Sequence, residues 1–169
     1  MLGMRLGEAI GLDRSDVDLH TGVVTIREAK FDRSRFVPLH PTATAALRRY
    51  TADRDRLCPN PRSGRFFLSG AGTALDRSGV EKVFRHITTT AGIRTRTAHP
   101  RIHDLRHSLA VHTLIEWQRA GMSIDGHIAA LSAYLGHISP ADTYWYLSAS
   151  PELMQLAAQR LHTRFGQPR

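Results

Sequence analysis

The spacing of apolar and polar residues along the chain predicts a mostly helical protein. In several segments apolar side chains recur every three or four residues, which is the period of an amphipathic helix. Ser139-Pro140 and Ser150-Pro151 are typical helix starts, because serine caps free backbone amides and proline fits the first turn. We therefore expect helices over residues 4–12, 41–57, 102–119 and 125–135, a helix over 78–91 capped by Ser78, and further helices beginning at Ser139 and Ser150.

Short runs of β-branched and aromatic residues predict a small sheet. Residues 22–26 and 35–39 are such runs, and the polar turn between them favours an antiparallel hairpin. Pro38 indicates an edge position or the end of a strand, since proline has no amide hydrogen to donate. Residues 66–68 are a candidate third strand, and residues 13–18 are expected to be a polar connection. The predicted fold is mixed α+β and mostly α-helical, with a small antiparallel hairpin or three-stranded sheet.

The charge of the chain indicates a polyanionic partner. Lys and Arg total 23 against 15 Asp and Glu, a net charge of +8, and Lys30 and Lys82 are the two lysines. Arginine forks suit phosphate oxygens, so this balance favours nucleic acid, although many surface arginines are only solvated. A single cysteine, Cys58, excludes an intrachain disulfide and fits a reducing cytoplasm. No apolar run approaches the roughly 18 residues of a membrane span.

Two short motifs carry candidate chemistry. His103 and Arg106 are spaced i and i+3, so they share one face of a helix and present a proton carrier beside a cation. Leu135-Gly136-His137 is followed by the helix that bears Tyr146, and Gly136 is expected to end the preceding helix. Either motif by itself is more often structural than catalytic.

Taken together, these motifs resemble the tyrosine recombinase (phage integrase) family. That family carries, in chain order, an Arg followed by Glu three residues later, a Lys in a β-hairpin, His-x-x-Arg, Leu-Gly-His, and a Tyr nine residues after that His. The matching residues here are Arg5 with Glu8, Lys30, His103 with Arg106, His137 and Tyr146. The resemblance extends from Arg5 to Tyr146, which is nearly the whole chain.

The resemblance implies DNA cleavage and rejoining through a covalent 3′-phosphotyrosine, without a metal or another cofactor. Negative charge gathers on the phosphate oxygens during in-line attack, and fixed donors stabilise it. By resemblance, Arg5, Arg106 and His137 bind the scissile phosphate, and Tyr146 is the nucleophile. Lys30 is then the general acid for the leaving 5′ oxygen, and His103 an auxiliary general acid or base.

Each assignment has an alternative. Tyr144 is the rival nucleophile, but it lies about 200° around the helix from Tyr146, so both cannot face one phosphate. Arg5 could simply pair with Glu8. His103 and His107 have an i, i+4 metal-ligand spacing, yet no glutamate follows His103, so we expect no metal site. Arg33, Arg35 and Arg101 are candidate contacts to the DNA backbone.

The resemblance also implies a domain organisation and partners. Family members usually carry a DNA-clamping domain before the first Arg, so we expect residues 1–169 to be one catalytic domain with the N-terminal core-binding domain absent. The implied partner is double-stranded DNA, bound by a homotetramer in the cytoplasm at the bacterial nucleoid, with no membrane. Alternatives are an inactive DNA-binding remnant of a mobile-element integrase, a type IB topoisomerase-like enzyme and a zinc hydrolase.

Overall fold

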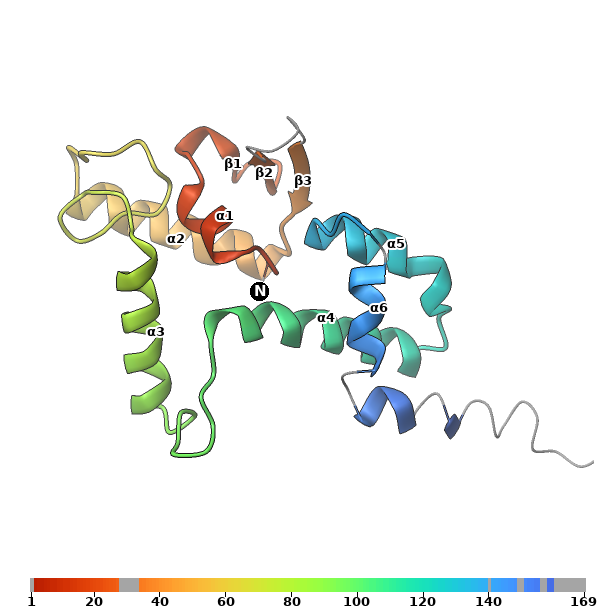
Figure 1. The fold of residues 1–169 in the computed structure, drawn as a ribbon. Helices are drawn as coiled ribbons and strands as arrows, with labels where there is room; N and C mark the ends of the chain where they lie inside the picture. The colour runs from red at the N-terminus through yellow and green to blue at the C-terminus, as the bar shows by residue number, and fades with distance from the viewer. Residues whose placement is uncertain (1, 28–33, 140, 149–150, 156–157, 160–169) are drawn as a thin grey trace, which may run out of the picture. The chain divides into compact units, whose positions relative to one another are not determined.

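The computed structural model describes most of the chain (Figure 1). The described residues are 2–27, 34–139, 141–148, 151–155 and 158–159. The chain divides into two compact units, unit 1 (Met1–Arg106) and unit 2 (His107–Arg169). Helix α4 (Ile102–Arg119) supplies residues to both. Among the described residues, no helix is long and apolar enough to cross a bilayer.

Unit 1 combines a small sheet with helices, as the sequence predicts. The first helix, α1, is followed by a 3₁₀ turn, η1, before the strands begin, and α2 and α3 follow the strands. Buried side chains of the sheet and of the loop after α2 form its core, including Val24, Ile26, Val37 and Phe66. The elements are α1 (Leu6–Gly11), η1 (Arg14–Asp16), β1 (Val17–Asp18), β2 (Val23–Arg27), β3 (Ser34–Pro38), α2 (Pro41–Leu57) and α3 (Arg77–Thr90).

The three strands form one antiparallel sheet in the order β1-β2-β3 (Figure 1). Val24 pairs with Val37 and Val23 pairs with Pro38, so the predicted hairpin is confirmed. Pro38 is the last residue of the edge strand β3, where a missing amide hydrogen costs little. Lys30 and Arg33 lie outside the described residues, in the connection between β2 and β3.

The cap of helix α3 is Asp76 rather than Ser78, so the helix begins two residues earlier than a cap at Ser78 would place it. A carboxylate oxygen of Asp76 accepts a 2.8 Å hydrogen bond from the amide of Gly79. That bond lowers the pKa of Asp76. A carboxylate at a helix N-terminus also interacts favourably with the helix dipole, which explains why Asp76 takes the position.

Residues 66–68, predicted to be a strand, do not form one in the structure. A short strand lies instead in residues 13–18, which were predicted to be a polar connection. Arg65 and Leu68 make isolated bridges to Asp13 and Ala74. Phe66 is buried and packs against Tyr50, so its aromatic character reflects burial in a loop. The segment predicted as a connection, residues 13–18, holds η1 and β1.

Unit 2 is helical and packs around one apolar cluster. It contains most of α4, α5 (Ile124–Leu135), α6 (Ala141–Ser148) and a helical turn over residues 151–155. Leu114 and Leu135 are fully buried, and each contributes about 1.5–3 kcal/mol through removal from water. The cluster consists of Ala110, Leu114, Ile115, Leu131, Leu135, Tyr146 and Leu153.

The joint between α5 and α6 is a glycine turn, as predicted. Gly136 has φ = 70°, a left-handed conformation that a side chain would strain. The amide of the next residue, His137, donates a 3.0 Å hydrogen bond to the carbonyl of Ser132 and closes the helix end. His137 is thereby held directly against the end of α5, ahead of the helix that carries Tyr146.

Candidate active site

Arg5 is held at the start of α1 by Glu8. The backbone amide of Arg5 donates to Glu8 Oε2 at 2.8 Å, and Arg5 Nη1 lies 2.7 Å from Glu8 Oε1. The pairing of Arg5 with Glu8 considered from the sequence is therefore present. The Arg5 side chain is still 44% exposed, so pairing does not bury the guanidinium.

Glu8 has a second partner that the sequence did not indicate. Arg35 Nη2, on β3, donates to Glu8 Oε2 at 2.8 Å, and both side chains are largely buried. Burial by itself would raise the pKa of Glu8, but hydrogen bonds from Arg35 and Arg5 outweigh it and hold that pKa below its usual value. Glu8 thus links the edge strand of the sheet to Arg5. The DNA contact expected of Arg35 stays a prediction.

Arg106 is buried beside the segment that leads into Arg5. Its side chain is 3% exposed, and Nη1 donates to the carbonyl of Gly3. A buried guanidinium needs such acceptors, because an unpaired buried charge is very costly. The contact brings the two arginines of the family motif, far apart in sequence, to neighbouring parts of unit 1.

Unit 1 contains a strongly basic cavity, which we call the arginine cavity. Its volume is about 460 Å³. Five guanidinium groups line it, against one carboxylate, that of Glu81, which lies 3.7 Å from Arg77. Clustered guanidinium groups are well suited to phosphate oxygens. The polar residues that line the cavity are Arg5, Arg77, Glu81, Arg85, Arg94, Arg101 and His103.

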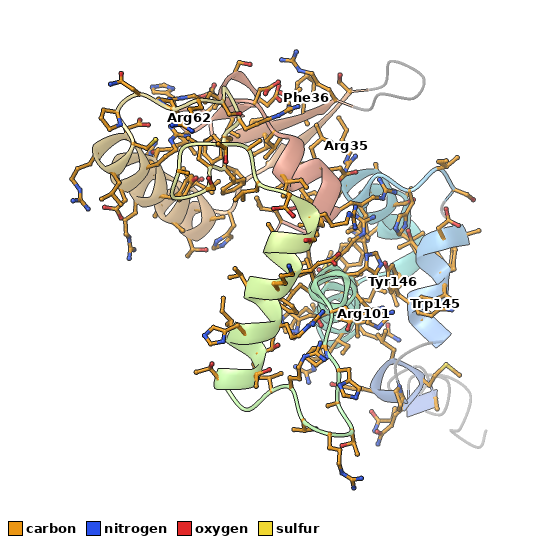
Figure 2. The ribbon with its side chains drawn as sticks, turned by 60° about the vertical axis from the view of Figure 1, so that its left-hand side comes forward. Arg35, Phe36, Arg62, Arg101, Trp145 and Tyr146 are labelled. Carbon is orange, nitrogen blue, oxygen red and sulfur yellow. The ribbon has the colours of Figure 1, made fainter. Side chains whose placement is uncertain are left out.

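Arg101 and His103 reach the arginine cavity from the start of α4. The amide of Arg101 donates to Asp104 at 2.8 Å, and its guanidinium lies 3.1 Å from the same carboxylate. The backbone hydrogen bond, followed by the guanidinium contact, lowers the pKa of Asp104 although burial opposes it. The side chain of Arg101 remains 77% exposed, so it can still meet a ligand (Figure 2).

In unit 2, His137 and Tyr146 lie against each other. Their rings are nearly parallel, with centroids 6.0 Å apart and an interplanar angle of 17°. Nδ1 of His137 lies 2.8 Å from the hydroxyl of Thr143, which is fully buried one helical turn before Tyr146. His137, the candidate hydrogen-bond donor to the phosphate, and Tyr146, the candidate nucleophile, are therefore neighbours. Thr143, on the same helix α6 as Tyr146, links them.

Two further aromatic side chains surround Tyr146. The ring of His107 lies 5.1 Å from that of Tyr146. The ring of Trp145, labelled with Tyr146 in Figure 2, lies 5.6 Å from the Tyr146 ring. Sequence reasoning considered His107 only as a possible metal ligand. In the sequence, the signal that could have indicated a role of His107 in the active site was its position directly after Arg106 of the His-x-x-Arg motif.

The structure separates the two candidate tyrosines. The hydroxyl of Tyr144 donates to a carboxylate oxygen of Asp125 at 3.1 Å. That hydrogen bond is the main cause that raises the pKa of Tyr144. Because a nucleophilic phenol has to lose its proton, the contact disfavours Tyr144. Tyr146 instead lies beside two imidazole rings.

Comparison with known proteins places the chain in a family. The model of the phage integrase family matches residues 1–152. The chain belongs to the phage integrase family. The resemblance to tyrosine recombinases inferred from the motifs is thereby confirmed.

The similarity extends to curated relatives and solved structures. The chain is 42% identical over 166 residues to the integrase/recombinase y4rB of Sinorhizobium fredii (strain NBRC 101917 / NGR234), covering 96% of this chain and 53% of the relative. A crystal structure of XerA recombinase is 28% identical, with a TM-score of 0.75 over 99% of this chain and 54% of that one. XerH recombinase, in a post-cleavage complex with its palindromic difH substrate, is 27% identical, with a TM-score of 0.68 over 93% of this chain and 42% of that one. The predicted fold class is confirmed, and the chain spans about half the length of the curated relatives it matches.

The motif residues of the phage integrase family divide between the two units. In unit 1, Arg5 and His103 line one cavity, and Arg106 binds the backbone at Gly3. In unit 2, His137 and Tyr146 are in ring contact. Lys30 lies outside the described residues. Within the described part of the chain, no group of three or more His, Cys, Asp or Glu side chains is placed to hold a metal ion.

Proposed function

We propose that this chain is the catalytic part of a site-specific DNA recombinase or integrase that cleaves and rejoins double-stranded DNA through a 3′-phosphotyrosine intermediate. The observation that most supports the proposal is the arginine cavity, where Arg5 and His103 lie together although they are distant in sequence. A cavity with five guanidinium groups fits a phosphodiester far better than a neutral or cationic substrate.

In the proposed reaction, Arg5 and Arg106 bind the non-bridging oxygens of the scissile phosphate, and His137 donates a further hydrogen bond to them. These donors stabilise the negative charge that gathers in the transition state, which is the largest contribution that a protein makes to phosphoryl transfer. The ion pair with Glu8 and the bond to Gly3 support this role, because both restrict the arginine they hold. His103 acts as an auxiliary general acid or base beside Arg5.

The phenolic oxygen of Tyr146 attacks phosphorus, and the bond from phosphorus to the 5′ oxygen breaks. The phenol gives its proton to a base, a role that we assign to His103, and the leaving 5′ oxygen takes a proton from Lys30, the proposed general acid. The phosphodiester becomes a 3′-phosphotyrosine, so the energy of the broken bond is kept. A 5′ hydroxyl from another strand then reverses the step without ATP or water.

The remaining assignments concern binding. Arg33, Arg35 and Arg101 are proposed contacts to the DNA backbone, with Arg101 best supported, since it is exposed at the arginine cavity. We further propose that residues 1–169 act as one catalytic domain and that four copies assemble on DNA. Net charge, the single cysteine and the DNA substrate support a place at the bacterial nucleoid in the cytoplasm.

The test is covalent trapping on DNA. A pool of duplexes with randomised cores, 5′-labelled and nicked so that the freed fragment diffuses away, is incubated with the protein and resolved on a denaturing gel. The wild type and Tyr144→Phe are expected to form labelled protein–DNA adducts, and Tyr146→Phe is expected to form none. Adducts that persist in Tyr146→Phe would refute the assignment of the nucleophile. The absence of adducts from every form would favour an inactive DNA-binding remnant.

A further inference from the structure

Thr143 holds an unusual position between the two candidate site residues of unit 2. It lies on α6, three residues before Tyr146, so the two side chains project from the same face of the helix. Its side chain is fully buried, and its hydroxyl lies 2.8 Å from Nδ1 of His137. The same residue is therefore part of the nucleophile's helix and a partner of the imidazole.

The nitrogen that Thr143 binds determines what His137 can do. A neutral imidazole has one nitrogen that donates and one that accepts, and a hydrogen bond at one nitrogen selects the state of the other. A fully buried hydroxyl requires an acceptor for its proton, and Nδ1 is within hydrogen-bond distance. When Nδ1 accepts, the ring proton is on Nε2.

A fixed ring orientation is supported by three separate contacts. The left-handed Gly136 and the bond from the His137 amide to Ser132 place its backbone. The ring of Tyr146, 6.0 Å away and nearly parallel, contacts one face of the imidazole. The hydroxyl of Thr143 then sets the rotation of the ring within its plane.

We propose that Thr143 is a positioning residue: its hydroxyl donates to Nδ1 of His137, keeps the ring proton on Nε2 and aims that proton at the scissile phosphate. The inference builds on the proposed recombinase function. Thr143 does not touch the reacting atoms and acts through His137. Because α6 also carries Tyr146, the donor and the nucleophile are held in one arrangement.

The first test reads the tautomer directly and needs no DNA. Two-bond ¹H–¹⁵N correlation spectra of the whole ¹⁵N-labelled chain at about pH 8, where histidine is neutral, distinguish protonated from unprotonated ring nitrogens. The His137 signal is identified by its loss in His137→Gln. We expect the Nε2–H form in the wild type and in Thr143→Ser. In Thr143→Val, which keeps the shape and removes the hydroxyl, we expect both tautomers.

The second test measures adduct formation on the nicked duplex pool. Thr143→Val is expected to form adducts about 10- to 100-fold more slowly, somewhat less than the loss from removing a transition-state donor itself. Thr143→Ser should restore the rate. Thr88→Val is the matched control, because Thr88 is also a buried helical threonine, whose hydroxyl donates to the carbonyl of Phe84 on α3. We expect its rate to match the wild type.

Either of two results would overturn the proposal: an Nδ1–H tautomer in the wild type, or an unchanged adduct rate in Thr143→Val. If thermal unfolding shows that Thr143→Val does not fold, Thr143→Ala takes its place in both tests. If no form yields adducts, the proposed function fails, and the tautomer measurement still decides whether the hydroxyl of Thr143 donates to Nδ1 of His137.

Discussion

The two units hold their candidate site residues by different physical means. In unit 1, Arg5 and Arg106 are held by charge and by hydrogen bonds, to Glu8 and to the carbonyl of Gly3. In unit 2, Tyr146 belongs to the apolar cluster and His137 packs on its ring. Charge and hydrogen bonds in unit 1 hold one partly exposed guanidinium, that of Arg5, and one buried guanidinium, that of Arg106, whereas apolar packing holds the buried Tyr146. The contrast teaches that the proposed reaction would draw on two kinds of support, charge and hydrogen bonds for the arginines and packing for the tyrosine.

The largest effect is expected from Leu114→Ala, which attacks the packing of unit 2. Leu114 is fully buried in the cluster that includes Tyr146. The loss of its methyl groups, with the cavity that remains, should lower the free energy of unfolding by about 2–5 kcal/mol. Urea denaturation measures the change. Leu57→Ala is the control, since Leu57 is 71% exposed, and it should change stability by less than about 0.5 kcal/mol. Equal losses in both would contradict the role given to the cluster.

The next effect separates the two arginines of unit 1. Arg5→Gln and Arg106→Gln should each slow adduct formation about 100- to 1000-fold, because each removes a donor to the phosphate. Arg106→Gln should also lower the free energy of unfolding by about 1–3 kcal/mol, since it leaves the Gly3 carbonyl without its buried partner. Arg5→Gln, at a partly exposed ion pair, should change stability by less than about 1 kcal/mol.

Arg62→Gln serves as the control for both arginines. Arg62 is exposed and is not among the residues that line the arginine cavity (Figure 2). We expect adduct formation at close to the wild-type rate. A loss as large as that of Arg5→Gln would mean that net charge, rather than position, controls the reaction.

A smaller effect, dependent on pH, is expected at Glu8. The folded protein lowers the pKa of Glu8 from its ordinary 4.5. Its contribution to stability is therefore fully present above that ordinary value and is lost as pH falls through the lower folded value. Glu8→Gln should cost about 1–2 kcal/mol at neutral pH, and the difference from the wild type should shrink in acid.

The pH profile of unfolding, measured by urea denaturation, checks this prediction. Glu116→Gln is the control, because Glu116 makes an exposed pair with Arg119. It should change stability by at most about 0.5 kcal/mol at any pH. A Glu8→Gln effect that stays constant from neutral pH into acid would argue against an ionised Glu8 as the link between Arg5 and Arg35.

The smallest effect is expected from Tyr144→Phe. It removes one exposed hydrogen bond to Asp125, so stability should fall only slightly, because water replaces an exposed partner. Adduct formation should continue at the wild-type rate, because Tyr144 does not face the imidazoles that flank Tyr146. The denaturing gel measures adduct formation, and thermal unfolding measures stability. Loss of adducts in this variant would reverse the assignment of the two tyrosines.

Sequence reasoning succeeded where the determinants are local. The predicted bounds of α2 and α4 agree with the structure, and so does the helix end at Gly136. Helical periodicity and capping depend on residues a few positions apart, so they can be inferred from the chain itself. The strand predicted over residues 66–68 was wrong because aromatic residues favour burial as much as strands, and Phe66 is buried in a loop.

The sequence by itself determined the order of the chemical groups from Arg5 to Tyr146. It also determined the family that these groups indicate. Tertiary structure decided which hydrogen bonds these groups make. The pairs are Arg35 with Glu8, Arg106 with Gly3, Asp125 with Tyr144, and Thr143 with His137. Most of these contacts join segments that are distant along the chain, and the orientation of a side chain depends on which neighbours the fold brings to it. Composition and spacing do not predict those neighbours, because a hydrogen bond forms only where the fold places two groups at a particular distance and angle.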